Sequence, residues 1–181
     1  NTDQCSITVT VVDNEDPVIT CPADPTVNND PGNCDAAVAS PLATFTDNCP
    51  GGTISNDYNG GGADASETYP LGTTVVTFTA TDATGLNTDQ CSITVTVVDN
   101  EDPVITCPAD PTVNNDPGNC DAAVAIPLAT FTDNCPGGTI SNDYNGGGAD
   151  ASDTYPLGTT VVTFTATDAT GLNTDQCSIT V

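Results

Sequence analysis

The amino-acid sequence predicts an all-β fold of tandem immunoglobulin-like β-sandwich repeats, each with two disulfides. Three observations lead to this prediction: an internal repeat, short stretches in which apolar and polar residues alternate, and a high cysteine content. The chain has 181 residues, of which nine are cysteines and 25 are acidic, and it contains no Lys, Arg or His. A chain of this length holds one ordinary domain or two small ones.

The internal repeat determines the domain organisation. Asn87 begins a copy of the stretch that begins at Asn1, so the period is 87 − 1 = 86 residues, and a third copy begins at Asn173. A window on a longer tandem array is expected to have this appearance. The first two copies differ at two positions, Ser40 against Ile126 and Glu67 against Asp153.

A dense turn signal marks where each repeat begins. The run from Asp13 to Pro17 reads DNEDP, and it returns at Asp99. Proline lacks an amide donor and biases the residue before it toward extended structure, so this run separates two strands. We therefore expect residues 1–12 to be the last strand of a preceding repeat, 13–98 to be the first repeat, and 99–181 to be the second repeat with its last strand cut short.

Strands are expected wherever apolar and polar residues alternate. Residues 6–11 and 76–81 both alternate and are rich in β-branched residues, as half-buried strands are. Further strands are expected over 18–21, 35–39 and 52–55, separated by connections rich in Gly, Pro and Asn. Short strands at this spacing favour an immunoglobulin-like sandwich. The chain has no Trp or Met, so the core is small and disulfides should offset the shortage.

The charge excludes several classes of function. A net charge of −25 is opposite in sign to the basic face that a nucleic-acid-binding protein needs, and it opposes docking on anionic membranes. No apolar run approaches the roughly 20 residues that span a bilayer. Without His, Lys or Arg, the usual general base and oxyanion-stabilising groups are missing, so we expect no enzyme. The Gly-rich run at 59–62 has no following Lys and is interpreted as a hairpin loop rather than a phosphate site.

The cysteines predict structural disulfides in an extracellular or cell-surface protein. The sequence contains no Cys-x-x-Cys pair and no His, which argues against zinc and redox sites. Four cysteines per repeat allow three connectivities, and sandwich topology places the first two at one end and the last two at the other. This favours the pairs Cys21–Cys34, Cys49–Cys91, Cys107–Cys120 and Cys135–Cys177. Cys5 is left over, and we expect its partner to be the third cysteine of a preceding repeat, outside this chain.

The motif order within each repeat resembles the hyalin repeat (HYR) family. Asp-x-x-x-Pro-x-Ile-x-Cys-Pro is followed by Thr-Asp-Asn-Cys, then Tyr-Pro-Leu-Gly-Thr-Thr, Thr-Ala-Thr-Asp-Ala, and finally Cys-x-Ile-x-Val. The similarity extends over both repeats. It implies an extracellular immunoglobulin-like domain, found in tandem and associated with adhesion, with no catalytic residue. Near-identical acidic repeats of this kind resemble those of large bacterial surface adhesins and fibres.

Clustered carboxylates make calcium a candidate cofactor. Calcium takes six to eight oxygen ligands, and sandwich topology brings the acidic turn to the same end as two other loops. The alternative is a solvated acidic linker with no bound ion. If calcium binds, its affinity should be weak, with a Kd of roughly 10⁻⁴ to 10⁻³ M, and it should stiffen the joints. The candidate ligands are Asp13, Glu15, Asp16, Asp47 and Asp82 in the first repeat and Asp99, Glu101, Asp102, Asp133 and Asp168 in the second, with Asp89 and Asp175 as further candidates.

Two functions fit these features. The first is a structural fibre or stalk whose partners are neighbouring repeats of the same array. The second is an adhesin in which the repeat itself recognises a glycan or partner protein. Near-identical copies favour the first, because specific recognition usually requires loops that diverge. Residues 1–12 could also complete a sandwich in a neighbouring chain by strand donation, although simple truncation of an array is favoured. The Ser40/Ile126 position is expected at an edge or at a contact between repeats.

Overall fold

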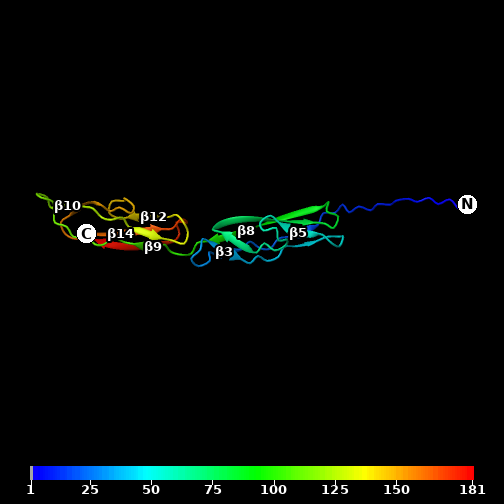
Figure 1. Cartoon of the computed structure of the whole chain (residues 1–181), viewed down its shortest axis with the longest axis horizontal. Helices are drawn as coiled ribbons and strands as arrows, with labels where there is room; N and C mark the ends of the chain where they lie inside the picture. The colour runs from blue at the N-terminus through cyan, green and yellow to red at the C-terminus, as the bar shows by residue number, and fades with distance from the viewer. Residues whose placement is uncertain (1) are drawn as a thin grey trace. The chain divides into compact units, whose positions relative to one another are not determined.

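The computed structural model describes residues 2–181 and divides them into two compact units (Figure 1). Of the described residues, the first unit comprises 2–27 and 37–96, and the second comprises 28–36 and 97–181. The unit boundaries therefore differ from the repeat boundaries, because the loop 28–36 of the first repeat folds with the second unit. Among the described residues every regular element is a strand, and no helix is long and apolar enough to cross a bilayer.

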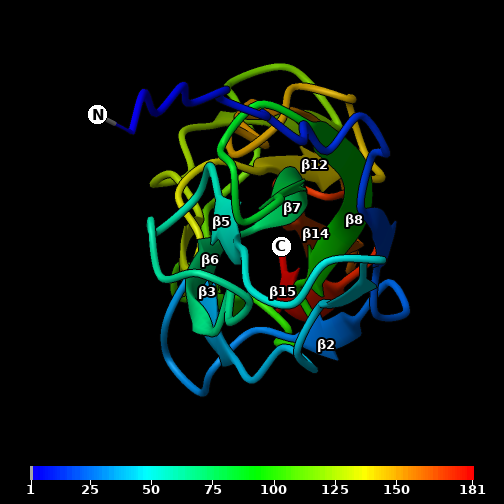
Figure 2. The ribbon, with the colours of Figure 1, turned by 90° about the vertical axis from the view of Figure 1, so that its right-hand side faces the viewer.

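The first repeat forms a four-stranded sheet and two strand pairs. The sheet has the order β2-β8-β7-β5, and the pairs are β1-β4 and β3-β6 (Figure 2). Antiparallel pairing places Ile19 opposite Phe45 and Asn56 opposite Phe78. The strands are β1 (Val18–Thr20), β2 (Thr26–Asn28), β3 (Asp35–Val38), β4 (Thr44–Thr46), β5 (Thr53–Asn56), β6 (Glu67–Pro70), β7 (Gly72–Thr81) and β8 (Thr88–Val98).

The second repeat forms a similar set with fewer strands. A three-stranded sheet has the order β12-β14-β15, and β9 pairs with β11 and β10 with β13. Both repeats confirm the predicted all-β, immunoglobulin-like architecture. The strands are β9 (Val104–Thr106), β10 (Asp121–Val124), β11 (Thr130–Thr132), β12 (Thr139–Asn142), β13 (Asp153–Pro156), β14 (Val161–Thr167) and β15 (Thr174–Thr180).

Alternation along the strands builds the core of each repeat. In β14, Val162, Phe164 and Ala166 are buried while the intervening Thr residues are only partly buried, as a strand with one core face requires. They join residues of β9, β10, β13 and β15 in one cluster. Tyr155 lies in this cluster and donates its hydroxyl to Ala151 O at 2.6 Å, so its polar group is satisfied inside the core.

The position that differs most between the repeats is buried in both. Ser40 is 8% exposed, and Ile126 is 5% exposed and belongs to the second core cluster. The Ser40 hydroxyl donates to Pro41 O at 3.2 Å, so this buried polar group has a hydrogen-bond partner. The expectation that this position lies at an edge or repeat contact is therefore wrong, since both side chains lie in the interior of their own repeat.

Asn56 organises the Gly-rich loop of the first repeat. Its side-chain amide donates to Asn59 Oδ1, Gly62 O and Asp64 O at 2.8, 3.0 and 3.1 Å, and its oxygen accepts from the Tyr58 and Asn59 amides. Asn142 does the same in the second repeat. The hairpin loop predicted from the sequence is thus held by a buried amide.

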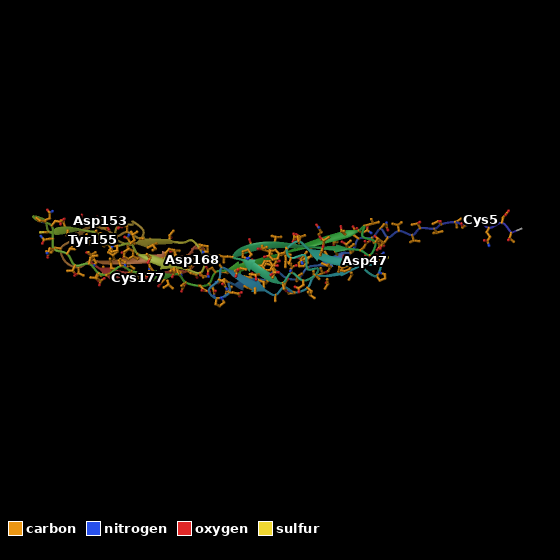
Figure 3. All side chains as sticks on the ribbon, in the orientation of Figure 1. Cys5, Asp47, Asp153, Tyr155, Asp168 and Cys177 are labelled. Atoms are coloured by element: carbon orange, nitrogen blue, oxygen red, sulfur yellow. A yellow bond between two sulfur atoms is a disulfide. The ribbon has the colours of Figure 1, made fainter. Side chains whose placement is uncertain are left out.

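The strand predicted over residues 6–11 does not form. Residues 2–17 contain no strand and run as an extended, largely exposed segment that carries Cys5 (Figures 1 and 3). The copy of 6–11, at 92–97, lies within β8. The difference is one of environment, because a strand needs a neighbour to accept and donate its backbone hydrogen bonds, and residues 92–97 have one in β7.

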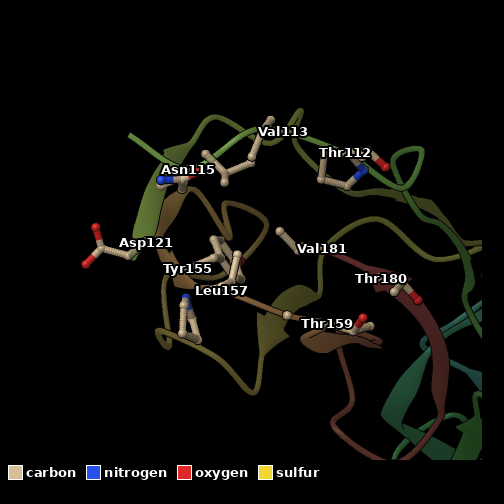
Figure 4. A pocket seen from close by; sticks show the side chains of 14 residues that line it. Thr112, Val113, Asn115, Asp121, Tyr155, Leu157, Thr159, Thr180 and Val181 are labelled. Carbon is tan, nitrogen blue, oxygen red and sulfur yellow. The ribbon is translucent and has the colours of Figure 1, made fainter. Parts of the chain in front are cut away.

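The two repeats also differ around β2 and its copy in the second repeat. β2 lies beside β8, and Thr96 N donates to Pro25 O at 2.9 Å. Residues 112–114 match β2 but form no strand. A pocket lies there instead, lined in part by Val113, Tyr155, Leu157 and Val181 (Figure 4).

Candidate functional site

Three aspartates of the second repeat lie at one end of the sandwich, each directly after a strand. Asp99 follows β8 and Asp133 follows β11. Asp168 follows β14 (Figure 3). The Asn173 side chain ties two of these segments together by donating to Asp99 O at 3.1 Å and to Asp168 Oδ2 at 2.9 Å. The predicted convergence of the acidic turn with these two loops is therefore present in the structure.

Asp168 uses its oxygens to hold its own loop. Its carboxylate accepts from Thr170 Oγ1 and Gly171 N, both at 2.7 Å, and from Leu172 N at 3.1 Å, in addition to Asn173. Burial raises the pKa of this carboxyl, but these hydrogen bonds outweigh burial and lower the pKa below its ordinary value. Asp168 is consequently a structural carboxylate with little capacity left for a metal. Its copy, Asp82, has the same partners.

Asp99, Asp133 and Asn134 leave buried oxygens without a hydrogen-bond partner. Asp99 Oδ2, Asp133 Oδ1 and Asn134 Oδ1 are all buried and unpartnered, and the Asp99 side chain is 2% exposed. Burial raises the pKa of Asp133, and the negative charges of Asp99 and Asp168 raise it further. A buried acceptor without a donor costs on the order of 1–3 kcal/mol, so such a group calls for an explanation.

The first repeat reproduces this arrangement within its own unit. Asp13 Oδ2 and Asp47 Oδ1 are buried and unpartnered, and Asn87 donates to Asp13 O at 3.3 Å and to Asp82 Oδ2 at 2.9 Å. The carboxylates with an oxygen that lacks a hydrogen-bond partner therefore occupy matching positions, Asp13 and Asp47 in the first repeat and Asp99 and Asp133 in the second. Sequence analysis missed the amide of Asn134, although its place beside Asp133 in the Asp-Asn-Cys motif offered a signal.

The remaining predicted ligands point elsewhere. Glu101 Oε1 accepts from Gly32 N at 2.7 Å and from Asn29 Nδ2 at 3.2 Å, so this side chain holds the loop 28–36. Asp89 and Asp175 accept from the first-strand amides of Ile19 and Ile105, both at 3.0 Å. Glu15, Asp16 and Asp102 are exposed. Among residues 2–181, no three acidic or cysteine side chains are grouped closely enough to enclose a metal.

The structure overturns the predicted disulfide pairing. The bonds join Cys21 to Cys91, Cys107 to Cys177, and Cys34 to Cys135. The predicted pairs Cys21–Cys34, Cys49–Cys91, Cys107–Cys120 and Cys135–Cys177 are all wrong. The physical reason is that the first and last strands of a repeat lie together, as the bond from Ile19 N to Asp89 shows, so Cys21 meets Cys91.

Three cysteines of the described residues are free thiols: Cys5, Cys49 and Cys120. Cys49 lies beside the acidic end of the first repeat. Its hydrogen bond with Asp13, together with burial and the charges of Asp13, Asp47 and Glu15, raises the pKa of the thiol, and the same hydrogen bond lowers the pKa of Asp13. In the second repeat the matching Cys135 is 1% exposed and bonded to Cys34.

Comparisons with known proteins identify a family for both repeats. The HYR domain family matches residues 12–97 and again 98–181. Hyalin of Strongylocentrotus purpuratus is 28% identical over 192 residues, which cover 98% of this chain and 14% of hyalin, so the chain spans a small part of that relative.

Among solved structures, the extracellular cadherin domains 1–5 of protocadherin Gamma B2 align over 91% of this chain and 38% of theirs, with 15% identity and a TM-score of 0.48. Titin domains z1z2 align over 93% of this chain and 96% of theirs, with 12% identity and a TM-score of 0.38. The matches to the HYR domain cover nearly the whole sequence in two consecutive copies, and the chain therefore belongs to the HYR domain family as a tandem pair.

Proposed function

We propose that this chain is a segment of an extracellular fibre or stalk, of the kind found in large surface adhesins, and not an enzyme. The observation that carries the proposal is the bond between the first and last strands of each repeat, Cys21–Cys91 and Cys107–Cys177. A pull on the two ends of a repeat reaches these cysteines and passes across the sulfur–sulfur bond. The residues between them carry no tension, so a repeat cannot be unravelled by stretching.

Membership of the HYR domain family and three disulfides support an extracellular location. The near identity of the repeats supports a spacer, in which each copy has the same mechanical role. The adhesin alternative has less support. A pocket lies beside Val113 and Leu157 in the second repeat, but the matching surface of the first repeat carries β2 paired with β8, so the two repeats do not share this pocket.

Single-molecule stretching tests the stalk. Each clamp spans a sequence separation of 70 residues. Opening one releases roughly 240 Å of extended chain at about 3.4 Å per residue. The oxidised chain should show no step of that size, and a reductant should produce two. The Cys34→Ser variant is the matched control, because it keeps both clamps and should behave as the unaltered chain does. A step of this length in the oxidised chain would contradict the proposal.

We further propose that calcium binds at the acidic end of each repeat and stiffens it. Asp99 Oδ2, Asp133 Oδ1 and Asn134 Oδ1 are hard oxygen acceptors of the kind calcium prefers, and the structure gives them no donor. A cation beside Asp133 would relieve the repulsion from Asp99 and Asp168 that raises the pKa of Asp133. Water would have to supply the remaining ligands, which agrees with weak binding.

Calcium titration of a matched pair of variants tests this site. At tenfold Kd, a bound ion should stabilise its repeat by about 1.4 kcal/mol. The double variant Asp47→Asn/Asp133→Asn removes one unpartnered carboxylate per repeat and should abolish the calcium-induced rise in Tm. The double variant Asp16→Asn/Asp102→Asn removes the same charge from exposed positions and should retain it. A rise that survives the first substitution would contradict the site.

A further inference from the structure

The Gly-rich loop of each repeat contains an asparagine that is followed directly by a glycine. Asn59 precedes Gly60 in the first repeat and Asn145 precedes Gly146 in the second, and no other asparagine of the sequence precedes a glycine. Glycine has no side chain that hinders the approach of another group to its amide nitrogen. All four residues are exposed. Each loop therefore places a side-chain carbonyl beside an unhindered backbone nitrogen at the surface.

Two donors hold the side-chain carbonyl oxygen of Asn59. Asn56 Nδ2 donates to Asn59 Oδ1 at 2.8 Å, and Gly61 N donates to the same oxygen at 2.7 Å. Asn56 is 7% exposed, so this donor is fixed inside the loop. When a nucleophile adds to the carbonyl carbon, negative charge develops on Oδ1, and donors that are already in place stabilise that charge without rearranging. The two donors are thus arranged as an oxyanion hole.

The second repeat has the same arrangement around Asn145. Asn142 Nδ2 donates to Asn145 Oδ1 at 2.9 Å, and Gly147 N donates to it at 2.8 Å. The side-chain nitrogen of Asn145 donates to Ser152 O at 3.3 Å. Because both repeats hold the asparagine carbonyl in this way, the arrangement is a property of the loop itself.

The nucleophile that can reach this carbonyl is the amide nitrogen of the following glycine. The bond from Gly61 N to Asn59 Oδ1 closes a ring of atoms that contains both Asn59 Cγ and Gly60 N, so these two atoms are kept close together. Among residues 2–181, no group accepts a hydrogen bond from Gly60 N or from Gly146 N. Since both glycines are exposed, water has access to the proton that the nitrogen must lose.

We propose that Asn59 and Asn145 are sites of self-deamidation, and that the folded loop promotes the reaction. Gly60 N gives its proton to water and adds to Asn59 Cγ, which forms a succinimide ring. The bond from Cγ to Nδ2 breaks, and the nitrogen takes up a proton and leaves as ammonia. Water then opens the ring at either carbonyl to give aspartate or isoaspartate, without an oxidant or a reductant. The inference is independent of the stalk and of calcium.

The conversion changes the hydrogen bonds of the loop as well as its charge. Asn59 Nδ2 donates to Ser66 O at 3.3 Å, whereas an aspartate has no donor at this position and would face that carbonyl with an oxygen. Each repeat also gains a negative charge, on a chain whose net charge is already −25. In isoaspartate the backbone passes through the side-chain carbon, which lengthens the loop. The loops of an old chain should therefore be more acidic and less tightly closed than those of a new one.

Peptide mass spectrometry of the folded and the unfolded chain tests the proposal. Chymotrypsin cuts after Tyr58 and Tyr144, and the two loop peptides differ in mass because the first carries Glu67 and the second Asp153. The folded chain, and the reduced chain in guanidinium chloride, are incubated at the same pH and temperature. We expect conversion of amide to acid to be faster in the folded chain by roughly tenfold or more, because preorganised donors lower the barrier. An equal or slower rate in the folded chain would overturn the proposal, since the hydrogen bonds would then protect the amide.

A pair of glycine variants tests whether the following amide is the nucleophile. Gly60→Ala adds a methyl group beside the attacking nitrogen at a position with a φ of 67° and no atom within 4 Å of the new Cβ. Conversion at Asn59 should fall by roughly tenfold or more, while Asn145 in the same chain keeps its rate. Gly85→Ala is the matched control, because its φ of 77° is similar and its Cβ also meets open space, and it should leave both rates unchanged. An unaltered rate at Asn59 in Gly60→Ala, or an equal fall in Gly85→Ala, would overturn the proposal.

Discussion

The two repeats differ at two sequence positions, yet the same residues behave differently in each. Asn29 is buried and its copy Asn115 is exposed, while Cys135 is buried and bonded and its copy Cys49 is a partly exposed thiol. Neither pair differs in local sequence. What differs is the surroundings: the loop 28–36 packs with the second unit, so the burial of these residues depends on what they contact and not on their local sequence.

The largest effect should come from removing the bond between successive repeats. Cys34→Ser is expected to make the loop 28–36 behave as 114–120 does. The loop-closure entropy that is lost corresponds to about 4 kcal/mol in the chain-entropy model. Hydrogen exchange at the Asn29 and Gly32 amides should rise toward that of Asn115 and Gly118. Unchanged protection of the first pair would show that the hydrogen bonds alone order this loop.

A smaller effect should follow from exchanging the buried residue that distinguishes the two cores. Ile126→Ser removes apolar volume from the second core and should cost roughly 1–3 kcal/mol of unfolding free energy. Ser40→Ile should stabilise the first repeat by roughly 1–2 kcal/mol through added apolar burial, provided the side chain fits as it does in the second repeat. Denaturant unfolding measures both.

The second position that differs between the repeats, Glu67 against Asp153, provides the control for the two core substitutions. Glu67 and Asp153 are exposed, and each accepts a hydrogen bond from the following Thr amide. Glu67→Asp should therefore change stability by less than about 0.5 kcal/mol. Equal effects at the buried and the exposed position would refute a role for core packing in the difference between the repeats.

A further prediction concerns the pH dependence of the Asp168 loop. Because the folded-state pKa of Asp168 is lowered, its hydrogen bonds contribute stability that is present above the unfolded pKa of about 3.9 and is lost as pH falls through the folded value. Asp168→Asn should cost roughly 1–2 kcal/mol at neutral pH and almost nothing at low pH. Thermal unfolding measured at a series of pH values checks this. For Asp102→Asn, at an exposed position, the difference in stability from the unaltered chain should not shrink as the pH falls.

Sequence reasoning predicted the fold well because alternation is a local property. Residues 18–20, 35–38 and 53–56 form strands close to where they were expected, and 76–81 lie within β7. The disulfide pairing failed because it depends on which loops share an end of the sandwich, and no local signal reports this. The strand over 6–11 failed for a related reason, since its pattern is right but its neighbour is absent.

The candidate calcium site was predicted in part. The convergence of Asp99, Asp133 and Asp168 followed from topology, because each one ends a strand at the same end of the sandwich. Topology did not predict which carboxylate oxygens remain without a hydrogen-bond partner. Asp168 has the same charge as Asp133, but Thr170, Gly171 and Asn173 donate hydrogen bonds to its oxygens, an arrangement that depends on how the loop folds.

Period, alternation and composition are all written along the chain, and they were enough to predict a tandem of acidic, cysteine-rich β-sandwich repeats. The disulfide partners could be known only from the folded chain, in which Cys34 bonds to Cys135 across a separation of 101 residues. The physical reason is that a disulfide forms between sulfurs that folding brings within bonding distance. Here the loop that carries Cys34 finds its hydrogen-bond partners in the second unit rather than in the first.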